Sequence, residues 1–288
     1  MLYRDFASQE AIDREYDVES IHPDFNSVVE LYLGLSETAR TTLDARFDVP
    51  FGPTRDEHVD LYPGRGEPGR PVLLFIHGGY WRILSSKEFA LVAPGPVAHG
   101  IDVVVTNYSL APKVTLDEIT RQSRATIAWV HENAASWGGD PDRIFVAGHS
   151  AGGQQVAMLL ETDWEGEYGL PADVIKGGIA ISGVFDLRPL PYSWLAAALQ
   201  LSRRTVETQS PALRVPPVAA PLLVTWGAEE TSEFRRQSEE YLAACTEAGV
   251  DARGLPQPGA DHFQAILGFN EPEGDLTGQL VEMTGGRG

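Results

Sequence analysis

The sequence predicts an α/β fold, in which a mostly parallel sheet carries helices on both faces. Short continuous apolar runs alternate along the chain with longer amphipathic segments. Buried parallel strands are typically continuous apolar runs, and the connections between them are usually helices. Hydrophobic residues make up 43% of the 288 residues, which suffices for a large core. We expect a single domain over residues 1–288.

The first part of the chain, residues 1 to about 50, is polar and carries a helical pattern. Apolar residues recur at helical spacing in the stretch DFNSVVELYLGLSETARTTL. The glycine and proline cluster YPGRGEPGR, residues 62–70, predicts a turn. We expect no strand before this cluster, and no Gly-Lys-Ser/Thr follows it, so a phosphate-binding loop is not indicated.

From residue 71 onward the pattern becomes regular. Five apolar runs predict strands, at residues 71–77, 101–108, 143–150, 174–183 and 221–227. Four amphipathic segments predict helices, at residues 87–100, 116–137, 151–162 and 232–249. Residues 186–216 form a connection that is longer than usual and contains several prolines. We expect a small helical flap there, close to the functional site.

The charge balance argues against several classes of partner. The chain carries 41 acidic and 22 basic residues, a formal net charge of -19. Such a surface repels nucleic acid phosphates and anionic lipid headgroups, so we expect neither nucleic acid nor membrane as a partner. The N-terminus lacks the apolar core of a signal peptide, and no apolar stretch approaches the ~18–20 residues of a membrane span. The cytoplasm is the expected location, and the sequence leaves a homodimer open.

The single cysteine, Cys245, excludes an intramolecular disulfide and a cysteine-based metal site. It lies in a helical pattern, where a cysteine usually behaves as a small buried hydrophobe. The seven histidines do not cluster in the sequence, and no His-Glu-x-x-His motif occurs. We therefore expect no metal and no cofactor.

The clearest functional signal is the stretch VAGHSAGG, which places Gly148-x-Ser150-x-Gly152 between a predicted strand and a predicted helix. In such an elbow a strained turn lifts the serine hydroxyl clear of the backbone, and the flanking glycines remove side chains that would collide. The helix that starts at Ala151 points its amides toward the site, where negative charge develops. Ser150 is therefore the expected nucleophile. The alternative is a plain glycine-rich turn.

A serine hydroxyl needs a general base to become an effective nucleophile. In this strand-turn-helix arrangement the partners follow the serine in the order acid, then histidine. Only His262 among the histidines lies after Ser150, in a loop near the C-terminus, so it is the expected base. We expect the side chain of His149, next to Ser150, to point away from the site and to pack.

The acid is expected after the strand at residues 221–227, where the sequence continues AEETSEF. Glu229 and Glu230 are the candidates, and Glu233 is a more distant one because it lies inside the next predicted helix. Asp261 neighbours His262, but sequence neighbours rarely turn both side chains toward each other. The alternative for each of these acids is a solvated loop carboxylate.

The stretch FIHGGYW ends a strand that is expected to lie near the elbow strand. A tetrahedral intermediate needs amide donors aimed at its oxyanion. One donor is expected from Ala151 and the others from this loop, with Gly79 and Tyr80 as first choices and Gly78 as the reserve. His77 precedes the serine in the chain, so we expect it to brace the loop rather than to act as the base.

These motifs together resemble an α/β-hydrolase of the arylformamidase (kynurenine formamidase) group, a neighbour of the hormone-sensitive-lipase-like esterases. The resemblance covers about residues 1–270 and includes NYSLAPKVTLDEITRQ, GGDPDRIFVAGHSAG, ISGVFDL and EFRRQSEEY. Those esterases generally carry His-Gly-Gly-Gly, whereas this chain has His-Gly-Gly-Tyr-Trp, the arylformamidase pattern. The polar N-terminal segment is similar too, and we expect it to pack near the site.

The resemblance implies that Glu230 is the catalytic acid, at a position where eukaryotic members carry aspartate. It implies a formamide attached to an aromatic amine as the substrate, with N-formylkynurenine as the best-known case. One departure is the stretch SWLAAALQL, where an asparagine is often found near Ala196. This departure bears on the substrate pocket and not on the three catalytic positions.

We therefore expect a serine hydrolase that cleaves a small acyl amide or ester through an acyl-enzyme, with a small molecule as its partner. Tyr80 and Trp81 are expected to wall the pocket against an aromatic leaving group, with Trp81 in the core as the alternative. Two other functions stay open. A general short-chain carboxylesterase would use the same residues, and a non-catalytic ligand-binding module could occupy the same fold.

Overall fold

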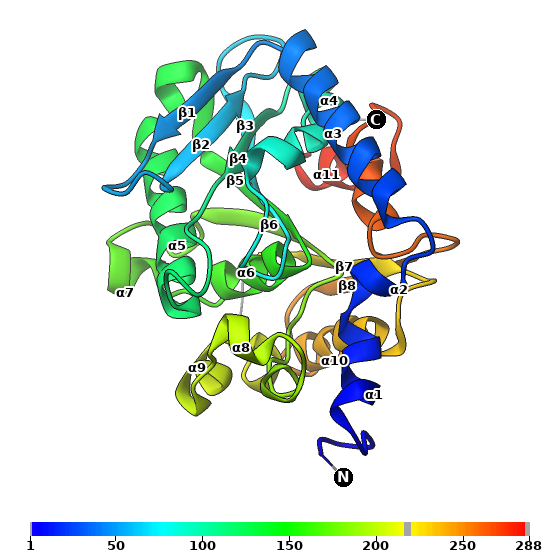
Figure 1. Cartoon of the computed structure of the whole chain (residues 1–288). Coiled ribbons are helices and arrows are strands. Elements are labelled where there is room, and N and C mark those ends of the chain that lie inside the picture. The colour runs from blue at the N-terminus through cyan, green and yellow to red at the C-terminus, as the bar shows by residue number, and fades with distance from the viewer. Residues whose placement is uncertain (1, 216–219, 286–288) are drawn as a thin grey trace.

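One eight-stranded sheet organises the chain, of which the computed structural model describes residues 2–215 and 220–285. The ends of the predicted domain, residues 1 and 286–288, and the last residue of the predicted flap, residue 216, lie outside the described residues. The strand order is β1-β2-β4-β3-β5-β6-β7-β8 (Figure 1). The strands are β1 Arg46–Pro50, β2 His58–Tyr62, β3 Arg70–Ile76, β4 Asp102–Thr106, β5 Gly139–His149, β6 Ile175–Ile181, β7 Leu222–Gly227 and β8 Ala252–Gln257.

The sheet is mostly parallel, as predicted. Only the pairs β1–β2 and β2–β4 are antiparallel among the described strands, and every other neighbouring pair is parallel. Parallel strands end at the same edge of a sheet, so the loops after β3, β5 and β7 meet there. These three loops contain the His-Gly-Gly motif, the serine elbow and the acidic stretch.

The two faces of the sheet bury two separate cores. Along β3, Val72, Leu74 and Ile76 belong to one core, and Leu73 and Phe75 belong to the other. Successive strand side chains point to opposite faces, which is why a continuous apolar run can serve both. The prediction of helices on both faces is therefore confirmed.

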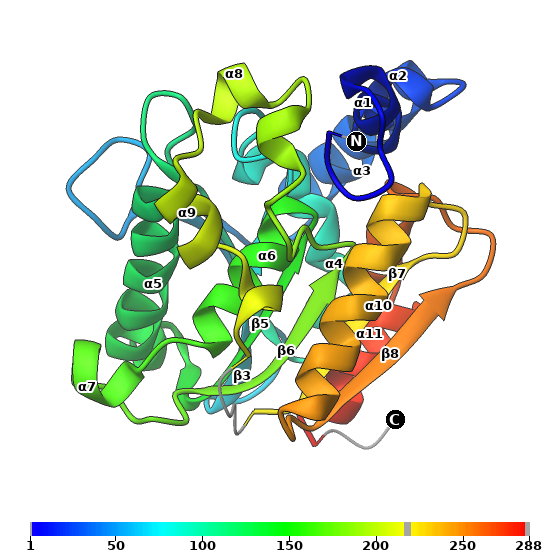
Figure 2. The ribbon, with the colours of Figure 1, turned by 90° about the horizontal axis from the view of Figure 1, so that it is seen from below.

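Different helices cover the two faces. The first core includes residues of α5 Leu116–Asn133, α6 Ala151–Leu160 and α10 Ser232–Glu247. The second includes residues of α3 Phe25–Thr42, α4 Pro94–Ala98 and α11 Asp275–Met283, which gather on one side of the sheet in Figure 1. Figure 2, seen from below, shows α10 in front of β8 and α11 behind it. The shorter helices are α1 Gln9–Tyr16, α2 Val18–Ile21, α7 Trp164–Tyr168, α8 Ala196–Leu199, α9 Arg203–Thr208, and the 3-10 turns Ser86–Val92, Ala134–Trp137, Leu190–Tyr192, Pro211–Leu213 and Gln264–Phe269.

Three strands were not predicted. β1 begins inside the segment that was expected to be helical up to about residue 50, and β2 ends where the turn cluster YPGRGEPGR begins. The expectation that no strand precedes this cluster is therefore wrong, although the cluster itself forms a turn between β2 and β3. β1 and β8 are the edges of the sheet and are largely exposed, so they lack the apolar runs that mark the central strands.

One predicted helix is broken. Residues 87–100 form a 3-10 turn, Ser86–Val92, followed by the short helix α4, Pro94–Ala98. Proline at the first helical position is favourable because its missing N–H is not needed there, so Pro94 starts a new helix. A capping box between Ser85 and Glu88 starts the 3-10 turn.

The N-terminal helices are tied to the end of the sheet where the three loops meet. The Tyr16 hydroxyl donates a 2.7 Å hydrogen bond to Glu233 of α10, and the Thr231 hydroxyl donates to the main-chain carbonyl of Glu15 at 2.8 Å. The Tyr32 hydroxyl of α3 donates to the carbonyl of Phe263 at 2.7 Å. These contacts hold α1 and α3 against the loops that follow β7 and β8.

Candidate active site

Ser150 lies in a strained turn between β5 and α6. Its backbone has φ 57° and ψ -114°, a combination that L-residues rarely adopt. A Cβ at Gly148 would collide with the carbonyl of Gly152, and a Cβ at Gly152 would collide with the carbonyl of Ile76. The Ser150 amide donates a 2.8 Å hydrogen bond to the Ile181 carbonyl of β6, which anchors the elbow. Both flanking glycines are therefore required by close packing.

His262 and Glu230 form a buried pair beside this elbow. Nδ1 of His262 lies 3.2 Å from Oε2 of Glu230, and both side chains are almost fully buried. The other Glu230 oxygen accepts hydrogen bonds from the Ser182 hydroxyl at 2.5 Å and from the Gly227 amide at 2.7 Å. The carboxylate is thereby oriented from two sides, with one oxygen left for the imidazole.

The remaining candidate acids have other partners. Glu229 is exposed, although its neighbour Glu230 is buried. Glu233 accepts hydrogen bonds from Tyr16 and from Arg236. Asp261 accepts from the amides of Phe263 and Gln264 and lies 3.1 Å from a ring nitrogen of His22. Of the four acids that the sequence analysis considered, the structure brings only Glu230 to within hydrogen-bond distance of His262.

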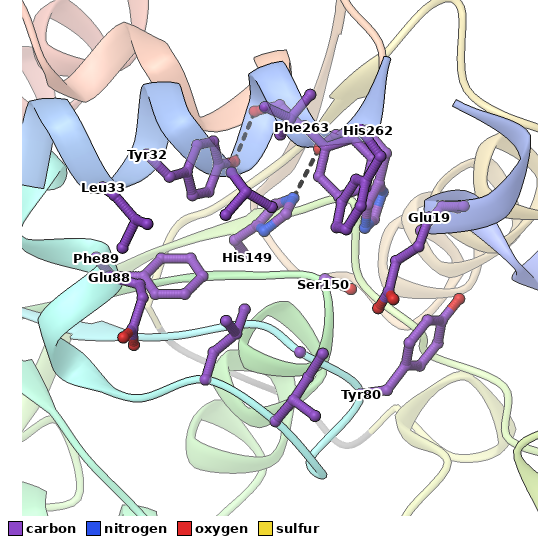
Figure 3. Close-up of a pocket in the computed structure, with 17 residues that line it drawn as sticks. Glu19, Tyr32, Leu33, Tyr80, Glu88, Phe89, His149, Ser150, His262 and Phe263 are labelled. Atoms are coloured by element: carbon purple, nitrogen blue, oxygen red, sulfur yellow. Dashed lines mark hydrogen bonds between the residues drawn. The ribbon is translucent and has the colours of Figure 1, made fainter. Parts of the chain in front are cut away.

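Ser150 and His262 line the same cavity, shown in Figure 3. No hydrogen bond joins the Ser150 hydroxyl to His262 in the described structure. Catalytic hydrogen bonds of this kind often tighten only when substrate is bound. Ser150, His262 and the oriented carboxylate of Glu230 therefore lie together beside the cavity.

The His-Gly-Gly loop, defined here as residues 77–81, faces the elbow. Gly79, Tyr80 and Trp81 all have positive φ values, of 105°, 48° and 57°. A Cβ at Gly78 would lie 3.3 Å from the Ser150 Cβ, and a Cβ at Gly79 would collide with the Ile83 carbonyl. The loop can therefore approach the serine only because these two positions carry no side chain.

Four amides are available at this point. The N–H groups of Gly78, Gly79, Tyr80 and Ala151 have no hydrogen-bond acceptor among the described residues. Ala151 is the first residue of α6, where backbone amides have no partner inside the helix. Unpaired amides beside a nucleophile can stabilise a developing oxyanion.

His77 stabilises the His-Gly-Gly loop by ring stacking and hydrogen bonding. Its ring stacks on Tyr108 with centroids 4.1 Å apart, and its Nδ1 lies 2.7 Å from the Gly78 carbonyl. The Tyr108 hydroxyl donates to the His77 carbonyl at 2.9 Å. Burial lowers the pKa of His77 to about 4, so the ring stays neutral at pH 7.

His149 does not point away from the site, contrary to expectation. It lines the cavity beside Ser150, and its ring centroid lies 4.7 Å from that of His262 (Figure 3). Its Nε2 lies 2.8 Å from the His262 carbonyl, so this nitrogen must carry the proton. Burial lowers the pKa of His149 well below its ordinary value, and the nearby His262 adds to this effect. His149 therefore supports the backbone of the loop that carries His262.

The two aromatic residues of the His-Gly-Gly loop, Tyr80 and Trp81, lie in different surroundings. Tyr80 lines the cavity, and its hydroxyl donates a 2.6 Å hydrogen bond to the Tyr16 carbonyl. Trp81 is 0% exposed, lies in the core and does not line the cavity. The expectation that Trp81 walls the pocket is therefore wrong. With positive φ at both positions, the two successive side chains leave the backbone in different directions.

The N-terminal helices form much of the cavity wall. The sequence alone did not indicate which of their residues line it. Val18 and Glu19 come from α2, and α3 contributes Phe25, Val28, Val29, Tyr32 and Leu33. The helical spacing of the α3 residues was visible, but it could not show that this face covers a cavity rather than a core.

The predicted flap does contain helices, α8 and α9, but none of its described residues, 186–215, lines this cavity. Its closest link to the site is Trp194, whose ring packs edge-on against Tyr80 at 5.8 Å. The Trp194 amide also donates to Asp13 of α1 at 2.6 Å. The N-terminal helices occupy the place expected for the flap.

No metal or membrane feature is found in the described residues. Within residues 2–215 and 220–285, no group of three or more His, Cys, Asp or Glu side chains is placed to hold a metal ion. No helix in the same ranges is long and apolar enough to cross a membrane. Burial raises the pKa of Cys245 to about 11, so its thiol is unreactive at neutral pH.

Comparison with known proteins agrees with this geometry. A family model described as "alpha/beta hydrolase fold" matches residues 73–265. Kynurenine formamidase from Danio rerio is 32% identical over 256 residues, which covers 87% of this chain and 85% of that protein. The kynurenine formamidase from Salmo salar is 30% identical over 257 residues, with the same two coverages. Esterase LipQ from Mycobacterium tuberculosis is 29% identical over 239 residues, or 75% of this chain and 56% of that protein.

Solved structures give the same fold. A protein from Silicibacter sp. TM1040, provisionally named a thioesterase, superposes with a TM-score of 0.82 at 27% identity, over 93% of this chain and 97% of that one. An esterase from Pyrobaculum calidifontis has a TM-score of 0.72 at 19% identity and covers 96% of both chains. The chain belongs to the α/β-hydrolase family, and it is similar over most of its length to kynurenine formamidases.

Proposed function

We propose that this protein hydrolyses a small acyl amide or ester through a covalent acyl-enzyme, and that its preferred substrates are aryl formamides. The observation that carries the proposal is the contact between His262 and the doubly anchored carboxylate of Glu230, beside the strained Ser150. A base that is oriented by a buried carboxylate next to a serine elbow is the arrangement that activates a hydroxyl.

In the proposed mechanism, Ser150 Oγ attacks the substrate carbonyl while Nε2 of His262 takes the hydroxyl proton. Glu230 holds Nδ1–H and stabilises the imidazolium that forms. His262 then donates the proton to the leaving nitrogen, the carbon–nitrogen bond breaks, and an acyl-serine and an amine result. Water attacks the acyl-serine with His262 again as the base, which releases formate or another short acid.

The developing oxyanion would be held by the free amides of Ala151 and of the His-Gly-Gly loop. Gly79 and Tyr80 line the cavity and are the first choices in this loop, whereas Gly78 does not line it. Removing one such donor in enzymes of this type costs roughly 10²–10³ in kcat.

The formamide preference rests on the relatives. Two proteins about 30% identical over most of both chains are named kynurenine formamidases. The His-Gly-Gly-Tyr-Trp sequence adds a large side chain, Tyr80, where the esterase motif has a third glycine. A large side chain next to the reacting carbonyl favours a short acyl group, and formyl is the shortest.

The test is the ratio of kcat/KM for aryl formamides, including N-formylkynurenine and formanilide, to kcat/KM for p-nitrophenyl acetate and butyrate. We expect hydrolysis of the formamides, formyl and acetyl substrates preferred over butyryl by roughly tenfold or more, and no turnover by Ser150→Ala. Formamide rates at the level of the Ser150→Ala variant, beside efficient ester cleavage, would contradict the formamide preference.

A short-chain carboxylesterase is the second candidate. It is supported by Esterase LipQ, at 29% identity over 75% of the chain, and by the apolar walls of the cavity. In that case butyryl or longer esters would be the best substrates. A non-catalytic binding module would hydrolyse none of these compounds, so any turnover that depends on Ser150 excludes it.

A further inference from the structure

The cavity beside Ser150 is apolar over almost its whole surface. Its volume is about 190 Å³. Its walls are made by side chains from α2, α3, the His-Gly-Gly loop, residues 83–89 and the loop after β8. The apolar members are Val18, Phe25, Val28, Val29, Tyr32, Leu33, Tyr80, Ile83, Leu84, Phe89 and Phe263.

The apolar surface continues outward at the mouth of the cavity. Val29, Leu33 and Leu84 line the cavity and are 40%, 49% and 41% exposed. Exposed apolar side chains that continue the lining of a cavity are typical of a ligand-binding groove. A substrate that extends from Ser150 toward α3 would cover them.

The side-chain donors around the cavity, apart from those of Ser150 and His262, are already engaged by the protein. The Tyr32 hydroxyl donates to the Phe263 carbonyl, and the Tyr80 hydroxyl donates to the Tyr16 carbonyl. Nε2 of His149 donates to the His262 carbonyl. Apart from the reacting groups, these side chains have no free donor with which to hold a carboxylate of the substrate.

The charges that line the cavity are negative. Glu19 and Glu88 are its only Asp, Glu, Lys or Arg residues within the described ranges, and Figure 3 shows them on opposite sides of Ser150. Glu88 accepts from the Ser85 amide and hydroxyl at 2.8 and 2.7 Å. Arg82 lies 3.6 Å from Glu19 and stacks on Trp194, so it faces away from the cavity lining.

A second observation agrees with a negative field at this site. Burial, and then the charges of Glu19, Asp17 and Glu230, raise the pKa of Tyr80 well above its ordinary value, and the charge of Arg82 only partly offsets them. The whole chain adds to this field, with a formal net charge of -19. An anionic group brought into the cavity would lose its hydration, and the cation nearby, Arg82, is already paired with Glu19.

We infer that the leaving group of the substrate is an apolar aryl or alkyl amine or alcohol without a carboxylate or other anionic substituent. This inference rests on the proposed function and narrows it. Neutral aryl formamides of the formanilide type should be better substrates than formamides whose amine half carries an acid, a class that includes N-formylkynurenine. Discrimination of this kind comes from repulsion and lost hydration and not from any added attraction.

The test uses three formanilides whose rings carry a propyl, a 2-carboxyethyl or a 3-aminopropyl chain. The saturated chain separates the charge from the reacting bond, so the intrinsic reactivities stay alike. We expect kcat/KM for the carboxyethyl compound to be at least about tenfold below that for the propyl compound, and the gap to shrink as salt is added. The aminopropyl compound should not suffer this loss.

Two variants assign the effect to the cavity carboxylates. Glu88→Gln keeps a side chain that can complete the capping box, and Glu19→Gln removes the other charge. Each substitution should reduce the difference in kcat/KM between the propyl and the carboxyethyl compound. Glu247→Gln makes the same charge change on the exposed last residue of α10, just before β8 begins and at the sheet edge opposite the elbow, and should leave the gap unchanged.

The outcomes separate this inference from the proposed function. If none of the three formanilides is cleaved faster than by Ser150→Ala, the formamide function itself fails. If all three are cleaved at Ser150 but the carboxyethyl compound equals or exceeds the propyl compound, the function stands and the inference on charge is wrong. An unchanged gap in both Glu19→Gln and Glu88→Gln would also overturn the assignment to these residues.

Discussion

The Tyr80 hydroxyl donates a 2.6 Å hydrogen bond to the main-chain carbonyl of Tyr16. This buried contact joins the His-Gly-Gly loop to the C-terminal end of α1, which are 64 residues apart in the chain. Tyr16 in turn donates to Glu233 of α10. The N-terminal helices are therefore connected both to the proposed oxyanion donors and to the helix that follows the acid.

Tyr80→Phe should weaken this connection. The Tyr16 carbonyl would be left buried without this partner, at a cost of about 1–3 kcal/mol in the free energy of unfolding. We expect KM to rise, because α2 and α3 line the cavity, and we expect faster proteolysis within residues 2–24. Urea unfolding and limited proteolysis measure these effects.

Tyr192→Phe is the matched control. The Tyr192 hydroxyl makes no hydrogen bond among the described residues, and the side chain is 43% exposed. This variant should change stability by less than about 0.5 kcal/mol. Equal effects of the two substitutions would mean that the Tyr80 hydroxyl does not hold the N-terminal helices.

The strain at Ser150 predicts an inverted order of stability for two inactive variants. Both Ser150→Ala and Ser150→Gly should lower kcat by about 10³–10⁶. At φ 57° and ψ -114° a Cβ is unfavourable, so the glycine variant should be more stable than the alanine variant by about 1 kcal/mol. Thermal unfolding of the two variants measures the difference.

Ser123, inside α5, provides the comparison. Its backbone is helical, so alanine there should be more stable than glycine by about 1 kcal/mol. The two sites should therefore show opposite orders. The same order at both would argue that the elbow stores no strain in solution.

Glu230→Gln should lower kcat by about 10²–10⁴. The amide nitrogen of glutamine would face either the Gly227 amide, which is a donor, or Nδ1 of His262. In the second case Nδ1 must accept, and Nε2 then carries the proton and cannot take one from Ser150. Steady-state kinetics on any cleaved substrate measures the loss.

Glu229→Gln is the control for this position, because Glu229 is the exposed neighbour. It should change kcat by less than about tenfold. If Glu229→Gln lowered kcat more than Glu230→Gln, the acid would have been assigned to the wrong one of two adjacent residues.

The central part of the fold could be predicted because its strands are buried on both faces. β3, β4, β5, β6 and β7 carry continuous apolar runs, and the serine motif fixes the turn after β5. The edge strand β8, with the sequence ARGLPQ, is largely exposed and contains arginine, glycine and proline. Such a strand forms because β7 offers it hydrogen bonds, which leaves no pattern in its own sequence.

The site could be predicted where backbone geometry alone decides it, and not where distant segments meet. Ser150 and His262 follow from a strand end and from chain order, whereas these left both Glu229 and Glu230 open and the family resemblance singled out Glu230. The directions of His149 and Trp81 depend on packing against His262 and the core. The cavity wall depends on α3, which is more than 100 residues before Ser150, so no local pattern could reveal it.

Glu161 carries a buried carboxylate whose stability effect depends on pH. Neither oxygen has a hydrogen-bond partner in the described part of the chain, and Arg214 lies 4.0 Å away with 60% of its side chain exposed. Burial raises the pKa of Glu161 to about 8, and the two nearby arginines, Arg214 and Arg124, only partly offset it. Burial prevails because an arginine at 4.0 Å makes no hydrogen bond to the carboxylate.

The sign of the effect follows from this raised pKa. Between about pH 4.5 and pH 8 the unfolded chain loses the proton of Glu161 while the folded chain keeps it. The folded state therefore binds more protons, and this residue makes the protein less stable as pH rises through that window. Above pH 8 the penalty is complete and is on the order of a few kcal/mol.

Glu161→Gln should be close to wild type in stability near pH 4 and progressively more stable than wild type up to pH 8. The exposed Glu165→Gln, on the neighbouring helix α7, should follow the wild-type curve throughout. Urea unfolding at pH 4, 6 and 8 distinguishes these outcomes, and parallel curves for Glu161→Gln and wild type would show that folding does not raise the pKa of Glu161.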